Sequence, residues 1–505
     1  MSDEGKSYRQ ILRSTSIIGG ASVINILVGL VRIKVAAVLL GPAGVGLIGL
    51  FTSLAGTASA VAGLGFGNVG TRQIALAVGR KDAAATAASR RALFWGTLAL
   101  AVLGAAVFWA LRGVLAQRVL GDATLSAEVG WLALAVGLTV AAASQSALLN
   151  GMRRIGDLAR VSVWSGLLST VLGVGALLLW GRDGLIAFVL VGPLASFVLG
   201  HVYVARLPKV MAPRTPLPDL ARQWGMLAKL GAAFMVAGLA GTLGQLLVRA
   251  LVQRELGSDA LGYFQAAATI SMTYVGFVLG AMGTDYYPRL AAAIHDHAAV
   301  NRLVNEQTEV ALLLAGPIFL AMIGLAPWVI ELLYASSFHP AAQVLRWQVL
   351  GDVLKVCSWP LGFIILAAGD GRTFMLTESV AVAVFVLLTW VLLPFLGVVA
   401  TGLAFVGMYL VYLPLVYGLA RRRTGFRWHR RIFTQMSALL LMAAAVMLAG
   451  MWSEKAAVVL GIFGVIGFGL HGLGRLGAMA NLTGAIGKAA RLCRRLMLKM
   501  GVRHE

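Results

Sequence analysis

Cationic side chains recur at matched positions inside apolar stretches of this chain, and these are the residues best suited to chemistry. Arg32 and Arg249 each end a Leu-Val-Arg triplet, about 215 residues apart. A guanidinium at membrane depth costs roughly 2.5–3.5 kcal/mol, so it usually faces the protein interior and has a role. Two such groups predict a cavity that holds an anion. The alternative is that they reach the lipid headgroups, as we expect of Arg254 and Arg346 nearer the periplasmic edge.

Further charged residues lie within apolar stretches. Lys34 follows Arg32 by two positions and points to a different face of the helix. Asp352 and Lys355 are three residues apart and are neighbours on one helix surface. Such a pair can lock helices together, or it can act as a protonation switch. Glu378, just inside the cytoplasmic end of another stretch, is assigned to the same switch, with an interfacial position as the alternative. The predicted anion-binding residues are therefore Arg32, Lys34, Arg249 and Lys355, and the predicted coupling residues are Asp352 and Glu378.

A third set of charges follows two glycine-rich segments. Arg72 comes after the first, and Asp285 and Arg289 come after the second. These residues are predicted to form a gate at the cytoplasmic mouth, and solvated loop ends are the alternative. The seven histidines show no metal-ligand spacing, and no phosphate-binding loop or nucleophile elbow is found. We therefore expect no metal, no cofactor and no enzymatic activity.

The composition determines which elements must position these groups. The 505 residues are 59% hydrophobic and 12% charged, with a mean hydropathy of +0.86, whereas soluble domains are about 25% charged. Apolar runs of about 20 residues recur throughout, and each is long enough to cross a bilayer. The sequence predicts an all-α polytopic membrane protein with about 14 spans and no separate soluble domain. The net charge of +22 follows from Lys and Arg in cytoplasmic loops, which places both termini in the cytoplasm and argues against a nucleic-acid partner.

Two halves of the chain share a pattern of span, cation and glycine turn. The turn from Gly41 to Gly46 corresponds to the turn from Gly257 to Gly262. Because six spans separate equivalent points, the predicted repeat is parallel, with two pseudo-symmetric six-helix lobes. The predicted organisation is an N-lobe (1–205), a cytoplasmic linker (206–229), a C-lobe (230–425), two extra helices (426–477) and a basic amphipathic tail (478–505), which we expect to lie on the anionic inner leaflet.

Several of these motifs resemble a known family. The phrase Trp-Gln-Val-Leu-Gly-Asp-Val-Leu-Lys at 347–355 is similar to a segment of Wzx-type flippases for O-antigen and enterobacterial common antigen. The turn at 41–47, the Tyr-Pro-Arg element at 287–289 and the three arginines at 421–423 are similar as well. The resemblance covers roughly residues 10–425 and implies membership of the multidrug/oligosaccharidyl-lipid/polysaccharide exporter superfamily.

The resemblance implies a fold of two six-helix lobes around a central cavity. It implies a cargo of a short glycan on undecaprenyl pyrophosphate, moved from the inner to the outer leaflet of the bacterial inner membrane. Arg32, Arg249 and Lys355 could then hold the pyrophosphate, and a flux of protons or sodium through Asp352 could drive the cycle. Membrane lipids, a glycan polymerase and other surface-polysaccharide assembly proteins are the implied partners.

Three alternatives remain open. A multidrug exporter of the same superfamily would need acidic residues in its cavity, whereas the N-lobe spans are almost free of them. A peptidoglycan-precursor flippase would use a similar cationic cavity and up to fourteen helices. A membrane-bound glycan polymerase or ligase would carry a large periplasmic loop, and none of the predicted outer turns is long enough.

Overall fold

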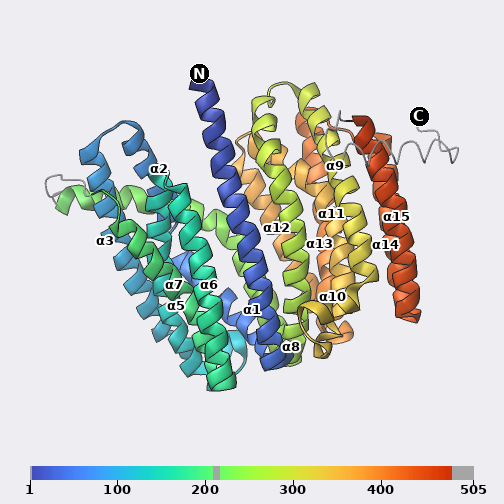
Figure 1. Cartoon of the computed structure of the whole chain (residues 1–505), viewed down its shortest axis with the longest axis horizontal. Coiled ribbons are helices and arrows are strands. Elements are labelled where there is room, and N and C mark those ends of the chain that lie inside the picture. Colours follow the sequence, from blue (N-terminus) through green and yellow to red (C-terminus); the bar gives the residue numbers. More distant parts are fainter. Residues whose placement is uncertain (1–2, 209–216, 480–505) are drawn as a thin grey trace. The chain divides into compact units, whose positions relative to one another are not determined.

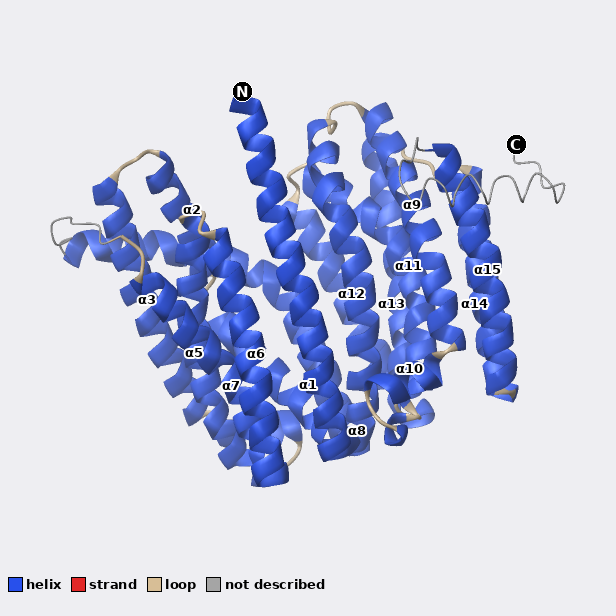
Figure 2. Ribbon diagram, in the orientation of Figure 1, coloured by secondary structure: helices blue, strands red, loops and turns tan. Residues whose placement is uncertain are grey.

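The computed structural model describes residues 3–208 and 217–479, and every regular element in these ranges is helical (Figure 2). Residues 209–216 of the predicted linker and residues 480–505 of the predicted tail lie outside the described residues. The interfacial tail helix therefore stays a prediction.

The helices follow one another with short connections, and Figure 1 colours them along the chain. The first long helices are α1 (Asp3–Ala62), α2 (Phe66–Gly79), α3 (Ala83–Ala110), α5 (Ser126–Gly151), α6 (Ile155–Trp180) and α7 (Leu185–Ala205). They are followed by α8 (Leu217–Ala292), α9 (His297–Gly324), α11 (Ala341–Ala367), α12 (Gly371–Leu396), α13 (Val399–Thr424), α14 (Arg430–Trp452) and α15 (Glu454–Met479). The short helices α4 (Arg112–Leu115) and α10 (Ala326–Leu333) complete the set of α-helices within the described ranges.

The number of membrane spans agrees with the sequence. Ten helices of the described residues are long and apolar enough to cross a membrane, and a helix pair bent by 47° within α8 makes an eleventh candidate. Three of these eleven hold two spans each. The candidate Gly19–Ala62 breaks at Gly41, Ile155–Ala205 contains both α6 and α7, and α8 breaks at Gly257. Separating them gives fourteen candidate spans among the described residues, and the chain is an all-α polytopic membrane protein.

The chain divides into two compact units. Unit 1 comprises Met1–Gly262 with Leu333–Ala335, and unit 2 comprises Tyr263–Leu332 with Ser336–Glu505. The predicted linker (206–229) takes in the start of α8 and the predicted C-lobe begins at residue 230, whereas α8 up to Gly262 belongs to unit 1. Trp224 of α8 donates a hydrogen bond to the Ala92 carbonyl at 2.9 Å, which ties α8 to α3. The predicted boundaries of the two lobes stay a prediction.

Helix α11 is the central helix of unit 2. It packs against α13, α9, α14 and α12, and it is the span with the largest buried share. Helices α14 and α15 pack against each other and against α9. In unit 1, α5 packs against α3, α7, α2 and α1, and α6 packs against α7 and α1. A polar side chain on the inner face of α11 is therefore removed from both lipid and water.

The predicted correspondence of the two glycine turns has a backbone counterpart. Gly41 has φ 64° and ψ −168°, and Gly257 has φ 83° and ψ −177°. This region of φ and ψ is adopted almost only by glycine. Each residue therefore breaks a long helix in the same way, at equivalent points of the repeat.

The two turns also contact each other within unit 1. A Cβ atom built on Gly46 would lie 2.6 Å from the Ser258 carbonyl oxygen and 2.7 Å from the Gly262 nitrogen. A Cβ atom built on Gly262 would overlap the Pro42 carbonyl group. Backbone approaches backbone here, which only glycine allows. The last glycine of each turn is therefore needed for packing against the other turn.

We expect Gly41→Ala and Gly257→Ala each to lower the free energy of unfolding by about 1–3 kcal/mol, because alanine is strained in this backbone conformation. Gly276→Ala in α8 is the matched control, since its Cβ atom would meet no atom within 4 Å. The control should be neutral or slightly stabilising, because alanine favours a helix interior. Denaturation in detergent, followed by tryptophan fluorescence, measures the three differences. Equal shifts in all three variants would contradict a special role for the two turns.

Candidate functional site

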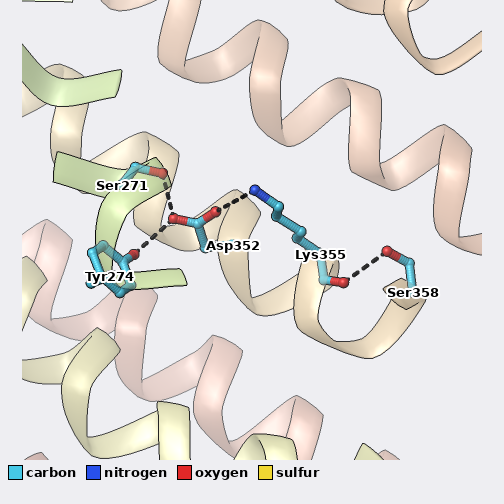
Figure 3. Close-up of polar contacts among 5 residues, drawn as sticks. All are labelled: Ser271, Tyr274, Asp352, Lys355 and Ser358. Atoms are coloured by element: carbon cyan, nitrogen blue, oxygen red, sulfur yellow. Dashed lines mark hydrogen bonds and ion pairs between the residues drawn. The ribbon is translucent and has the colours of Figure 1, made fainter. Parts of the chain in front are cut away.

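Asp352 lies at the centre of a buried polar cluster in unit 2 (Figure 3). Its side chain is 0% exposed. The carboxylate Oδ2 accepts hydrogen bonds from Ser271 Oγ and from the Tyr274 hydroxyl, both at 2.7 Å. Both donors lie on α8 after the break at Gly257, one turn apart. The carboxylate therefore joins α8 to α11 through charge-assisted hydrogen bonds.

The second oxygen of this carboxylate is held differently. Asp352 Oδ1 is buried and has no hydrogen-bond partner among the described residues. The Lys355 ammonium lies 4.0 Å away, which is an ion pair without a hydrogen bond. Lys355 is 23% exposed, and its nitrogen also lies 5.8 Å from the centre of the Phe405 ring. Oδ1 can therefore accept a proton or a cation without losing an existing hydrogen bond.

The sequence predicts the Asp352–Lys355 pair, and the structure brings these two side chains together. The two hydroxyl donors on α8 were missed. Their signal in the sequence is weak, because Ser271 and Tyr274 are merely polar residues three positions apart in an apolar span.

Glu378 of α12 is part of a second polar contact. Its Oε1 accepts a short hydrogen bond from the Tyr412 hydroxyl of α13. The ring of Tyr409, one turn earlier on α13, lies 6.0 Å from the Tyr412 ring. Tyr412 thus joins α13 to α12 through Glu378.

Arg32 is held by other helices of unit 1. Its guanidinium donates hydrogen bonds to Ser169 Oγ on α6 at 3.2 Å and to the Phe188 carbonyl on α7 at 2.5 Å. It also lies 4.2 Å from the centre of the Phe188 ring. Its Nε is buried and has no partner among the described residues, so one strong donor remains for an acceptor.

A cavity of about 390 Å³ adjoins Arg32. Its lining comes from α1, α5 and α7 and includes Thr52, Thr139 and Pro193. A charged group beside a mainly apolar cavity is typical of a ligand site. The structure therefore places Arg32 at a cavity inside unit 1.

Arg249 is buried, with 7% of its surface exposed. Its Nη1 donates to the carbonyl oxygen and to the side-chain oxygen of Gln245, one turn earlier on α8, at 3.0 and 2.8 Å. Lys34 is partly exposed on α1. The expectation that Arg32 and Arg249 face each other across a central cleft stays a prediction, since their described bonds go to different partners.

The predicted gate residues lie on the surface. Arg72 is exposed, and Asp285 and Arg289 form an ion pair of 3.1 Å with 76% and 58% of their side chains exposed. Such a pair contributes at most about 1 kcal/mol to stability. The buried residue in this segment is Tyr286, which donates to the Pro360 carbonyl at 2.9 Å and packs on the Trp359 ring. The sequence missed this tyrosine, and the gate stays a prediction.

The expected position of Arg346 near lipid headgroups is wrong. Its side chain is buried and donates to the carbonyl oxygens of Ile323 on α9 and Gly450 on α14, at 3.2 and 3.4 Å. The added helix α14 covers α11 at this point, which the sequence of α11 alone does not reveal. Arg254, by contrast, is exposed and donates to the Arg118 carbonyl at 3.0 Å.

Asp370, between α11 and α12, lies outside the spans. It accepts hydrogen bonds from the backbone nitrogen and the hydroxyl of Thr373 and pairs with Arg423 at the end of α13. These contacts hold the pKa of the Asp370 carboxyl below its usual value, and the hydrogen bonds from Thr373 have the largest effect. Arg423, the last of the three arginines at 421–423, therefore links the end of α13 to the start of α12.

Comparison with known proteins identifies the family. Residues 35–343 match the family model described as polysaccharide biosynthesis protein, which is more than half of the chain. The chain belongs to this family. Among curated proteins, the lipid III flippase of Escherichia coli (strain K12) is 25% identical over 421 residues, covering 81% of this chain and 97% of the flippase. The lipid III flippase of Shigella flexneri matches to the same extent.

Solved structures of two transport proteins have the same fold as this chain. The lipid II flippase MurJ in an inward closed conformation matches with a TM-score of 0.68 at 10% identity, over 90% of this chain and 98% of MurJ. An inward-facing multidrug resistance MATE family transporter of the MOP superfamily matches with a TM-score of 0.66 at 17% identity, over 82% of this chain and 95% of the transporter. The fold of the exporter superfamily, implied by the sequence motifs, is confirmed.

Proposed function

We propose that this protein is a flippase for an undecaprenyl-pyrophosphate-linked oligosaccharide, an O-antigen or similar surface glycan unit. The cargo moves from the inner to the outer leaflet by alternating access. The observation that carries this proposal is a half-buried arginine, Arg32, beside a cavity, in a chain related to lipid III flippases over nearly their whole length. A cationic group at such a site favours an anionic lipid over a cationic drug.

The cations divide between the two units. Arg32 and Arg249 lie in unit 1, and Lys355 lies in unit 2. Each arginine offers five N–H donors in a fixed geometry that suits phosphate oxygens. The unpaired Nε of Arg32 supports direct binding of a pyrophosphate oxygen. The polyprenyl chain stays in the lipid, since apolar surface gains nothing by leaving it.

Coupling to a proton or sodium flux is assigned to Asp352 and Glu378. The unpaired Oδ1 of Asp352 supports this assignment, because binding of a proton or cation there weakens its attraction for Lys355. Lys355 is then released toward an anionic cargo. The same binding event therefore links the ion to the cargo.

The orientation follows from the charge pattern. The protein lies in the bacterial inner membrane with both termini in the cytoplasm, because most of its 42 Lys and Arg residues then lie inside. A glycan polymerase and other surface-polysaccharide assembly proteins act on the flipped product. A peptidoglycan-precursor flippase is the second candidate, favoured by the count of fourteen spans.

Flipping by purified protein in proteoliposomes tests the proposal. Fluorescent undecaprenyl-pyrophosphate oligosaccharide, lipid II and a cationic dye are supplied in separate reactions. Translocation of the oligosaccharide, at a rate well above that of lipid II and of the dye, is the expected result. Preferential transport of lipid II would show that the protein is a peptidoglycan-precursor flippase. Efflux of the dye alone would show that it is a multidrug exporter.

A further inference from the structure

The two helices beyond the duplicated core enclose a second cavity. It has a volume of about 670 Å³ and lies among α9, α14 and α15, all within unit 2. Figure 1 shows these three helices side by side. The volume is within the range of small-molecule sites. The transport cycle proposed above uses none of the residues in its lining.

Basic groups gather at one end of this cavity. Arg430 and Arg431 begin α14, and His471 and Arg475 lie near the end of α15. One acid is close by, because Arg475 pairs with Glu309 of α9 at 3.1 Å. The lining therefore carries three guanidinium groups, and the adjoining carboxylate of Glu309 is paired with one of them, Arg475.

The start of α14 adds to this positive end. The first N–H groups of a helix lack partners within the helix and favour an anion. The residue before α14, His429, makes no side-chain hydrogen bond to the helix start. A phosphate at Arg430 and Arg431 would thus meet both side-chain and backbone donors.

A buried polar atom beside the basic end also lacks a partner. Gln435 is 7% exposed and lines the cavity one turn after Arg431. Its Oε1 has no hydrogen-bond partner among the described residues, while its Nε2 lies 3.5 Å from His471 Nε2. An unpaired buried acceptor costs about 1–3 kcal/mol, so it favours a ligand that carries a hydroxyl donor.

The other end of the cavity is apolar. Leu320, Met442, Phe463 and Phe468 line it, and Phe463 is exposed on the outer face of α15. Gly467 widens the space, because a Cβ atom built there would meet no atom within 4 Å. An acyl chain could lie along this surface while remaining in contact with the bilayer.

We propose that this cavity binds one anionic phospholipid with a hydroxyl-bearing headgroup, of the phosphatidylglycerol type. The phosphodiester lies against Arg430 and Arg431, the headgroup hydroxyl donates to Gln435, and an acyl chain passes Gly467 toward Phe463. The site is independent of the cargo assignment, since it uses α14 and α15 and none of the cations proposed to hold pyrophosphate. Its occupant would fasten the added helices to the core.

Native mass spectrometry of the full-length protein tests this proposal. The protein in detergent is titrated with dioleoyl phosphatidylglycerol, phosphatidic acid and phosphatidylcholine. We expect R430Q/R431Q to weaken phosphatidylglycerol binding roughly 30-fold, because each basic side chain near a membrane surface contributes about 1 kcal/mol. The control R421Q/R422Q removes two exposed arginines from the end of α13, outside the cavity, and should bind as the wild type does.

Two further variants separate the steps of the argument. Gly467→Phe fills the apolar end and should abolish retention of the lipid, whereas Gly175→Phe, at an equally open position on α6, should not. Gln435→Leu should remove the preference for phosphatidylglycerol over phosphatidic acid and retain binding of both. Size-exclusion profiles verify that each variant is folded.

The source of the lipid is decided by competition with undecaprenyl phosphate. If phosphatidylglycerol is retained against an equal concentration of undecaprenyl phosphate, the membrane supplies the ligand, as proposed. If undecaprenyl phosphate displaces it, the cavity belongs to the cargo path and the proposal is overturned. Equal loss of binding in R430Q/R431Q and R421Q/R422Q would overturn it too, because it would indicate unspecific attraction by charge.

Discussion

Replacing Arg32 and Arg249 together by alanine is expected to reduce oligosaccharide flipping by roughly a hundredfold or more. Hydrogen bonds to charged groups contribute about 1.5–3 kcal/mol each, and every 1.4 kcal/mol corresponds to a factor of ten. Arg249 is buried, and the half-buried Arg32 retains a donor without a described partner beside a cavity. Initial rates in proteoliposomes at matched protein density measure the loss.

The control for this experiment removes the same charge from the surface of unit 1. Arg160 is exposed on α6 in a pair with Asp157, and Arg222 is exposed on α8. The double variant Arg160→Ala, Arg222→Ala should flip at nearly the rate of the wild type. If both double variants lose activity equally, net charge alone controls the rate. If the Arg32, Arg249 variant remains active, the pyrophosphate is held elsewhere.

Asp352→Asn is expected to uncouple transport from the ion gradient and to lower the gradient-driven rate more than tenfold, while the protein remains folded. An asparagine oxygen can still accept the bonds from Ser271 and Tyr274, so the shape of the cluster is retained. The charge that balances Lys355 is lost, and the amide cannot take up a proton. Flipping with and without an imposed pH or sodium gradient measures the coupling.

Asp352→Ala separates this effect from a purely structural one. Removing one partner of a buried ion pair costs about 3–5 kcal/mol, and here two hydroxyl donors also lose their acceptor. The alanine variant should therefore unfold more easily than the asparagine variant. Asp352→Asn combined with Lys355→Met should restore stability without restoring coupling. If Asp352→Asn retains a full response to the gradient, Asp352 is structural and the ion binds elsewhere.

The internal repeat shows how far sequence reasoning reaches. Membrane spans can be predicted from sequence because a bilayer requires continuous apolar runs. Glycine turns can be predicted because few residues tolerate their backbone angles. The matched breaks at Gly41 and Gly257 confirm that the two turns correspond. The contact between Gly46 and Gly262 was not predictable, because it joins residues more than 200 positions apart.

The charged residues show where prediction from the sequence ends. Spacing along one helix predicts the neighbours Asp352 and Lys355, since residues three apart lie on the same face. It does not predict which other helix supplies the hydroxyls of Ser271 and Tyr274, nor that Arg346 is covered by α14.

The sequence by itself determined that this chain is an all-α membrane protein with an internal duplication and with cations in its spans. Each of these features is visible in the residues of individual membrane segments, or in a comparison of one segment with another, without knowledge of how the segments pack. Only the tertiary structure decided what each desolvated polar group contacts: Arg32 contacts the helices α6 and α7, Asp352 accepts from two hydroxyls of α8, and Gln435 lines a cavity among α9, α14 and α15. The physical reason is that desolvated polar groups must find partners across helix interfaces, and those interfaces arise from packing of all the helices together.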